Sequence, residues 1–140
     1  MSLDIERLEQ SFARIRPQAT AFSARFYDVL FTDYPQVRPL FVNSDMVEQQ
    51  QKLFASLELV VANLRDPDTV GRTLAGLGER HRRYGVVSEH YPMVGDALLK
   101  TLERQLATEW TAEVQSAWTV AFSTISQVMQ DAERPLGPPE

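Results

Sequence analysis

Residues 77–95, LGERHRRYGVVSEHYPMVG, are the stretch from which the rest of this chain can be interpreted. They contain both histidines of the protein, His81 and His90, and the pair Tyr91 and Pro92 that follows the second histidine. An imidazole on the apolar side of a helix needs partners for its two ring nitrogens. If His81 lies on such a side, each of its ring nitrogens needs a hydrogen-bond partner or a metal.

His81 continues an apolar stripe formed by Val70, Leu74 and Leu77, with spacings of four, three and four residues that predict a helix. Periodicity alone favours a core histidine bonded to a backbone carbonyl, because buried polar groups are nearly always hydrogen-bonded. The alternative is that one ring nitrogen binds a metal while the other donates to a carbonyl or carboxylate behind it. The stripe by itself leaves both interpretations open.

The inventory of ligand residues restricts which metal His81 could bind. The chain has no cysteine, and its two histidines are nine positions apart, so a zinc site with three or four protein ligands is hard to assemble. The Glu-x-x-His pairs of a di-iron carboxylate bundle are also absent from the sequence. Haem needs only one protein ligand and a flat apolar slot, so haem is the metal site that this inventory permits.

The totals over the whole chain exclude several classes of protein. Its 140 residues fit one domain, and its net charge of -5 argues against nucleic acid as a partner. No apolar run approaches the ~20 residues that span a bilayer. The charged start MSLDIERLEQ lacks the apolar segment of a signal peptide. We therefore expect a cytoplasmic protein without membrane contact, and a monomer or weak homodimer.

Apolar residues recur at spacings of three and four along most of the chain, and no stretch alternates with period two. This predicts an all-α fold of six to seven helices. The ranges predicted as helical are 4–16, 18–33, 45–64, 67–83, 92–106 and 111–133, with a turn or short tight helix over 34–41. The proline-rich residues 135–140 are predicted to be a disordered tail.

Four residues on other predicted helices and turns could complete a haem site. Tyr27 and Gln49 lie at the edges of apolar stripes, where a phenol and an amide can bond a small ligand or simply extend into water. Phe41 is either a core aromatic or a ring stacked on the cofactor. Glu133 continues the inner stripe of the last helix, where a carboxylate needs a partner unless the helix end is frayed.

Taken together, the pieces FYDVLFTDYPQVRPLF at 26–41, QQQKLFASL at 49–57, RHRRYGV at 80–86, EHYPMVGDALL at 89–99 and SAWTVAF at 116–122 form an ordered set. In this set the sequence resembles the bacterial single-domain haemoglobins and the haem domain of the flavohaemoglobins. The resemblance implies a globin domain over residues 1–134 whose helices enclose a pocket for haem b.

The resemblance also implies roles for the distal side of that pocket, where a gas would bind. Tyr27 matches the distal tyrosine, and Phe41 matches the ring packed on the haem. Gln49 matches the distal glutamine when counted back from His81. The count forward from Phe41 is one residue out, because the loop FVNSDMVE departs from some family members by an insertion, so Gln50 is the alternative.

On the proximal side, His81 matches the ligand of the iron. Tyr91 and Glu133 match two residues that form a hydrogen-bonded group with that histidine in the flavohaemoglobin-like pattern. His90 has no counterpart with a chemical role. The resemblance implies a pocket wall of apolar side chains: Leu53, Leu57, Leu77, Val86, Val94, Leu98, Phe122 and Ile125.

The function that the resemblance implies is reversible binding of O2, NO or other diatomic gases. One alternative is an enzyme, either a nitric oxide dioxygenase that depends on a separate reductase or a peroxidase-like protein. Turnover would then rest on Tyr27, Gln49, Tyr91 and Glu133. The other alternative is a gas sensor or a haem-free interaction module.

Overall fold

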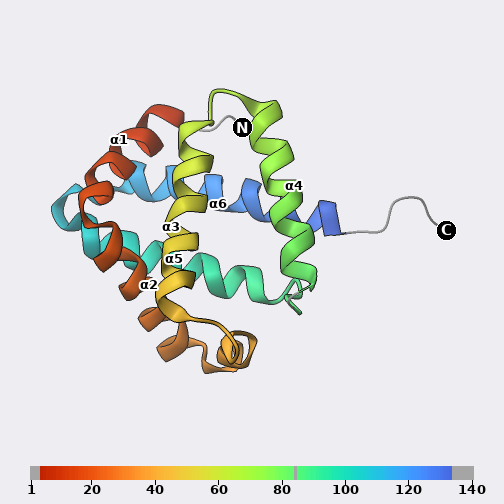
Figure 1. The fold of residues 1–140 in the computed structure, drawn as a ribbon. Helices are drawn as coiled ribbons and strands as arrows, with labels where there is room; N and C mark the ends of the chain where they lie inside the picture. Colours follow the sequence, from red (N-terminus) through yellow and green to blue (C-terminus); the bar gives the residue numbers. More distant parts are fainter. Residues whose placement is uncertain (1–3, 84, 134–140) are drawn as a thin grey trace.

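The computed structural model describes residues 4–83 and 85–133, with the side chains of 82, 83 and 131–133 outside the description. Within this part of the chain there are six α-helices, three 3-10 helices and no strand (Figure 1). The all-α prediction is therefore confirmed. The elements are α1 (Ile5–Ile15), η1 (Arg16–Gln18), α2 (Ala19–Asp33), η2 (Pro35–Phe41), α3 (Met46–Ala62), α4 (Pro67–Arg83), α5 (His90–Leu106), η3 (Ala107–Glu109) and α6 (Ala112–Glu133). The tail predicted at 135–140 lies outside the described residues.

Side-chain caps define where several helices begin. Asp45 accepts hydrogen bonds from the backbone of Val47 and Glu48, Asp66 accepts one from Thr69, and Thr111 accepts one from Val114; the full set of distances runs from 3.0 to 3.3 Å. These caps satisfy backbone N–H groups that have no partner within the helix. Aspartate and threonine are favoured at such positions, so the sequence itself indicates Asp45, Asp66 and Thr111 as caps.

Two helix boundaries differ from the predicted ones. α3 ends at Ala62, two residues before Leu64. α5 begins at His90 and not at Pro92, so the proline lies inside the first turn, where its missing N–H breaks no helical hydrogen bond. Consequently His90 belongs to the helix and not to the preceding loop.

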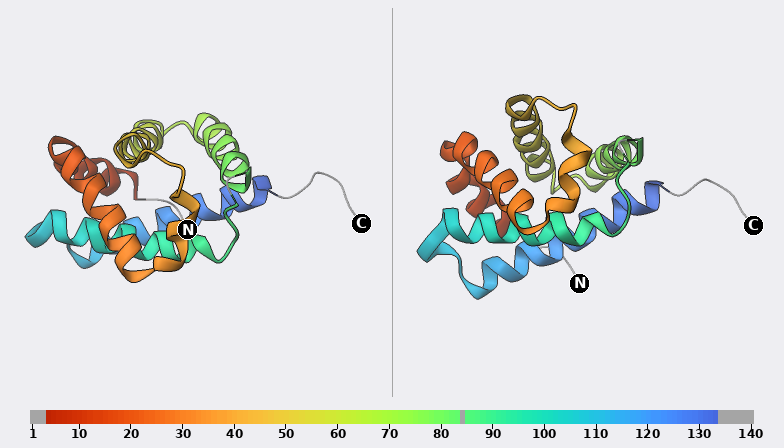
Figure 2. Two further views of the ribbon diagram at one scale, coloured as in Figure 1. Left: turned by 60° about the horizontal axis from the view of Figure 1, so that its bottom comes forward. Right: turned by 90° about the horizontal axis from the view of Figure 1, so that it is seen from below.

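Two pairs of helices, α3 with α4 and α5 with α6, are seen most clearly from below (Figure 2). α3 and α4 lie on the same side of the pair α5 and α6. α4 packs mainly against α6, and α2 packs mainly against α5 and α3. Within the described part of the chain, α3 and α4 have no comparable packing against each other. No helix among the described residues is long and apolar enough to cross a membrane.

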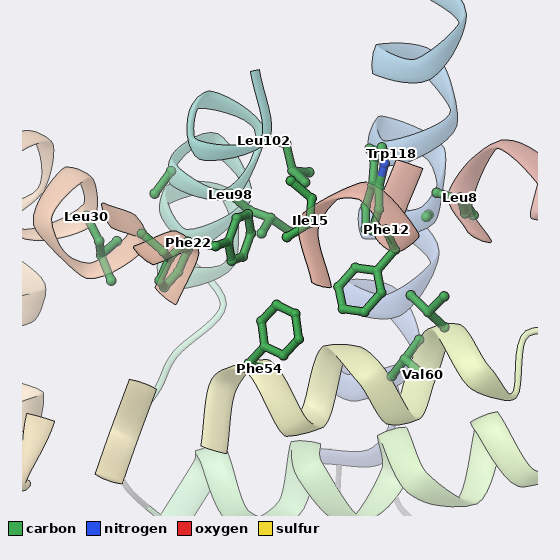
Figure 3. Close-up of a cluster of buried hydrophobic side chains, with 14 of the residues drawn as sticks. Leu8, Phe12, Ile15, Phe22, Leu30, Phe54, Val60, Leu98, Leu102 and Trp118 are labelled. Atoms are coloured by element: carbon green, nitrogen blue, oxygen red, sulfur yellow. The ribbon is translucent and has the colours of Figure 1, made fainter. Parts of the chain in front are cut away.

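Aromatic side chains from four helices form the centre of the core (Figure 3). Phe12 stacks on Phe54 at a centroid distance of 5.1 Å, and Phe22 meets Phe54 edge-on at 6.1 Å. Trp118 lies beside Phe12 at 6.4 Å and donates its indole N–H to Ser11 at 2.8 Å. Burial of large aromatic rings is a main source of folding free energy, so this cluster fixes α1, α2, α3 and α6 relative to one another.

Phe54 corrects the predicted inner face of α3. The spacing of apolar residues predicts an inner face of Leu53, Leu57, Val60 or Val61, and Leu64. The structure buries Val60, Val61 and Leu64 as predicted, but it buries Phe54 and leaves Leu53 and Leu57 half-buried. The reason is that α3 packs on α1 and α2 through the Phe54 side of the helix. Leu53 and Leu57 are thereby left at the margin of the core.

A polar cluster joins the end of α2 to α5. Tyr34 donates to the carboxylate of Asp96 at 2.8 Å, and Lys100 lies 2.8 Å from Asp33 and 3.0 Å from Asp96. The hydrogen bond with Asp33 and then that with Asp96 raise the pKa of Lys100. These side chains are partly exposed, so their net contribution to stability is small. Their effect is to hold the end of α2 against α5.

The backbones of α4 and α6 touch at Gly78. A Cβ atom at Gly78 would collide with the backbone carbonyl of Met129 and would lie 3.0 Å from its Cα. Only glycine therefore allows this crossing. Gly78 lies one turn before His81, so the close approach at Gly78 determines how near to α6 the backbone of His81 lies.

We predict that Gly78→Ala lowers the free energy of unfolding by about 1–3 kcal/mol, because the added methyl group overpacks a backbone contact. Gly71→Ala, in the same helix, meets no atom within 4 Å. It should raise stability by about 0.5–1 kcal/mol through helix propensity. Chemical denaturation of both variants measures the difference. Equal effects of the two substitutions would contradict the proposed crossing.

Candidate functional site

His81 lies half-buried in the last turn of α4. Its Nδ1 is 2.7 Å from the backbone carbonyl of Leu77, one turn earlier. A carbonyl only accepts hydrogen bonds, so Nδ1 carries the proton and Nε2 keeps its lone pair in the neutral ring. Nε2 has no hydrogen-bond partner among the described residues. This is the tautomer in which imidazole binds a metal through Nε2.

A metal at this position would have one protein ligand. Within the described part of the chain, no group of three or more His, Cys, Asp or Glu side chains comes together to hold a metal ion. A site of this kind suits a cofactor that brings its other metal ligands with it, as haem does.

An aromatic cluster forms at the junction of α2 and η2. Tyr27 is 6% exposed, and its ring meets Phe41 edge-on at 5.6 Å. Phe31 joins the cluster at 5.3 Å from Phe41 and 5.9 Å from Tyr27, and Arg38 lies over its outer face at 4.9 Å. Phe31 was not predicted as part of the site, although its position four residues after Tyr27 places the two rings on one side of the helix.

Tyr27 and Gln49 are brought together across α2 and α3. Burial raises the pKa of the Tyr27 phenol, and a side-chain hydrogen bond with Gln49 opposes part of that rise. The phenol is therefore protonated at neutral pH and can donate a hydrogen bond. Gln49 and Gln50 are both half-buried, so the choice of Gln49 over Gln50 as the distal glutamine stays a prediction.

The apolar residues predicted for the pocket wall lie mainly at the margin of the core. Half-buried side chains that pack against it are Leu53 and Leu57 of α3, Leu77 of α4, Val86 of the following loop, Val94 of α5 and Ile125 of α6. Leu98 is fully inside the core at 5% exposure. Partial exposure at the core margin is what a wall in contact with a bound apolar group requires.

Phe122 is placed differently from the other wall residues. Its ring lies against Gly95 of α5, so close that a Cβ at Gly95 would be 2.6 Å from it. The two residues also line a shallow surface hollow between α5 and α6, together with Pro92 and Leu99. Phe122 therefore serves the packing of α6 on α5, and its part in the pocket wall stays a prediction.

The predicted proximal partners of His81 are described only in part. Tyr91 is buried at 6% exposure in the first turn of α5. Glu133 ends α6, but its side chain lies outside the described residues, so its contact with His81 stays a prediction. A backbone carbonyl was expected as a partner of the His81 ring, and the structure identifies it as that of Leu77, which was not identified from the sequence. The four-residue spacing of Leu77 and His81 was the available signal.

These residues fit haem. Such a cofactor and a small ligand need a histidine that can present Nε2, a margin of apolar side chains, and a phenol and an amide next to an aromatic cluster; the described part of the chain provides all of these.

The globin family model matches residues 24–129. The match covers most of the chain, and the chain belongs to the globin family. Membership implies a haem cofactor in general and suggests small diatomic molecules as ligands.

Two kinds of relative are similar to this chain. The flavohemoprotein of Rhizobium meliloti (strain 1021) is 29% identical over 83% of this chain and 29% of its own length. The flavohemoprotein of Bacillus subtilis (strain 168) is 26% identical over 94% of this chain and 34% of its own length. The chain thus spans about a third of these relatives. An uncharacterized globin-like protein of Aquifex aeolicus (strain VF5) is 27% identical over 94% of this chain and 93% of its own.

Proposed function

We propose that this protein binds haem b through Nε2 of His81 and reversibly binds O2 and other diatomic gases beside Tyr27 and Gln49. The observation that carries the proposal is the His81 side chain, whose Nδ1 is held by the Leu77 carbonyl while Nε2 meets no hydrogen-bond partner among the residues that the structure describes. When bound, haem supplies the iron at which a diatomic gas can bind. From the sequence we further propose a cytoplasmic location and a monomer or weak homodimer.

On the proximal side, the protein controls the imidazole. The Leu77 carbonyl accepts a hydrogen bond from the N–H at Nδ1 of His81. This bond fixes the tautomer and makes Nε2 more basic. In this proposal Tyr91 and Glu133 strengthen the same effect. A more basic imidazole is a better electron donor to a metal.

On the distal side, the protein supplies hydrogen-bond donors. Tyr27 keeps its proton because burial raises the pKa of the phenol. The O–H of Tyr27 and the amide N–H of Gln49 can both donate to a diatomic ligand that carries partial negative charge. Phe41 and Phe31 restrict the phenol by ring contacts and keep water away from it.

We predict that His81→Gly abolishes the Soret absorption band of the protein after reconstitution with haem, because the ligand of the iron is lost. Added imidazole should restore the band, since it replaces the missing ring. Arg80→Ala, an exposed position on the same helix, is the control and should bind haem normally. A wild-type protein without a Soret band would refute the proposal and favour a haem-free interaction module.

We predict that Tyr27→Phe and Gln49→Ala each speed O2 dissociation about tenfold or more, because a hydrogen bond to a charged acceptor contributes about 1.5–3 kcal/mol. Stopped-flow displacement of O2 by CO measures the rate. Gln50→Ala is the matched control and should leave it unchanged. Equal rates in wild type and in both distal variants would remove Tyr27 and Gln49 from the site.

A second candidate function is nitric oxide dioxygenation with electrons from a separate reductase. Its support is the similarity to flavohemoproteins, whose name joins a flavin to a haem. We expect the oxygenated protein to convert nitric oxide to nitrate over many cycles when a flavin reductase and a nicotinamide cofactor are supplied. A single turnover followed by arrest would leave reversible gas binding as the function.

A further inference from the structure

The loop between α4 and α5 joins the two histidines by successive backbone N–H groups. The N–H of Val86 donates to the backbone carbonyl of His81 at 3.0 Å. The next N–H, that of Val87, donates to Nδ1 of His90 at 3.1 Å. In return, the N–H of His90 donates to the carbonyl of Val87 at 3.0 Å.

The reciprocal pair formed by Val87 and His90 closes a turn over residues 87–90, directly before α5. The backbone carbonyl of Val87 accepts from the N–H of His90, and the imidazole of His90 accepts from the N–H of Val87. His90 is also the first residue of α5, so the pair ties the loop to the start of that helix.

Hydrogen bonds, not burial, hold this loop. Val87 is 49% exposed, and Gly85, Ser88 and Glu89 are also exposed. Gly85 adopts φ +90°, a conformation that residues with side chains rarely adopt, and a Cβ atom at Gly85 would lie 3.5 Å from Leu40 of η2. The loop therefore spans from the carbonyl of His81 to α5 and passes beside η2, the element that ends at Phe41.

We propose that His90 is a positioning residue for His81, acting through the connector formed by Val86 and Val87. The His90 imidazole holds the Val87 N–H, and this keeps Val86 on the carbonyl of His81 and at the margin of the core. The proposal rests on the proposed binding of haem at His81. Without the acceptor at position 90, the N–H of Val87 bonds to water. The hydrogen bond from Val86 to the His81 carbonyl is then weakened, and the last turn of α4 becomes more mobile.

The test compares two acceptor-free variants, His90→Leu and His90→Ala, with His90→Asn. The amide oxygen of Asn lies as many bonds from the backbone as Nδ1 does, so it can accept the same N–H. Ser88→Ala, an exposed position in the same turn, is the control. Three properties are measured: amide hydrogen exchange at Val87, haem transfer to an excess of a haem acceptor, and the iron–histidine stretching frequency of the ferrous protein.

We expect His90→Leu and His90→Ala to increase Val87 exchange and haem loss about fivefold, the factor that one ordinary hydrogen bond contributes. The iron–histidine frequency should shift in the same variants, whereas His90→Asn and Ser88→Ala should behave as wild type. An Asn variant that matches Leu and Ala, or an unchanged frequency in all variants, would overturn the proposal. A wild-type protein that takes up no haem would instead overturn the proposed function, and with it any role of His90 toward the ligand.

Discussion

The backbone contact between α4 and α6 at Gly78 is the constraint on which the rest of the site depends. It lets α4 lie directly on α6, and His81 follows one turn later with its Nδ1 on the Leu77 carbonyl. A side chain at position 78 would push α4 outward and move His81 with it. The position of the His81 ring thus depends on the absence of a Cβ atom at Gly78, one turn earlier in the same helix.

The two sides of the site are held by different forces. On the α2 and η2 side, ring contacts among Tyr27, Phe31 and Phe41 hold the phenol, and burial keeps it protonated. Near His81, backbone hydrogen bonds hold an exposed loop. Aromatic packing resists displacement in every direction, whereas a chain of single hydrogen bonds can open at one residue. We therefore regard the loop after His81 as the adjustable side of the site.

Much of the fold could be predicted from the sequence because its signals are local. Helical spacing identified all six α-helices, and Asp45, Asp66 and Thr111 marked their starts. The site was less predictable because contacts between helices decide it. Leu53 and Phe54 are neighbours on overlapping stripes of α3, and only the packing against α1 and α2 selects Phe54 for the core.

The sequence by itself determined that the chain is helical, that His81 continues an apolar stripe, and that the chain resembles a known family. These conclusions depend on residue types and on spacings within single elements. Only the tertiary structure decided that Phe54 and not Leu53 enters the core, that Gly78 and not Gly71 is the crossing, and that His90 bonds to Val87. Each of these depends on the angle and depth at which separate segments meet, which no spacing along the chain specifies.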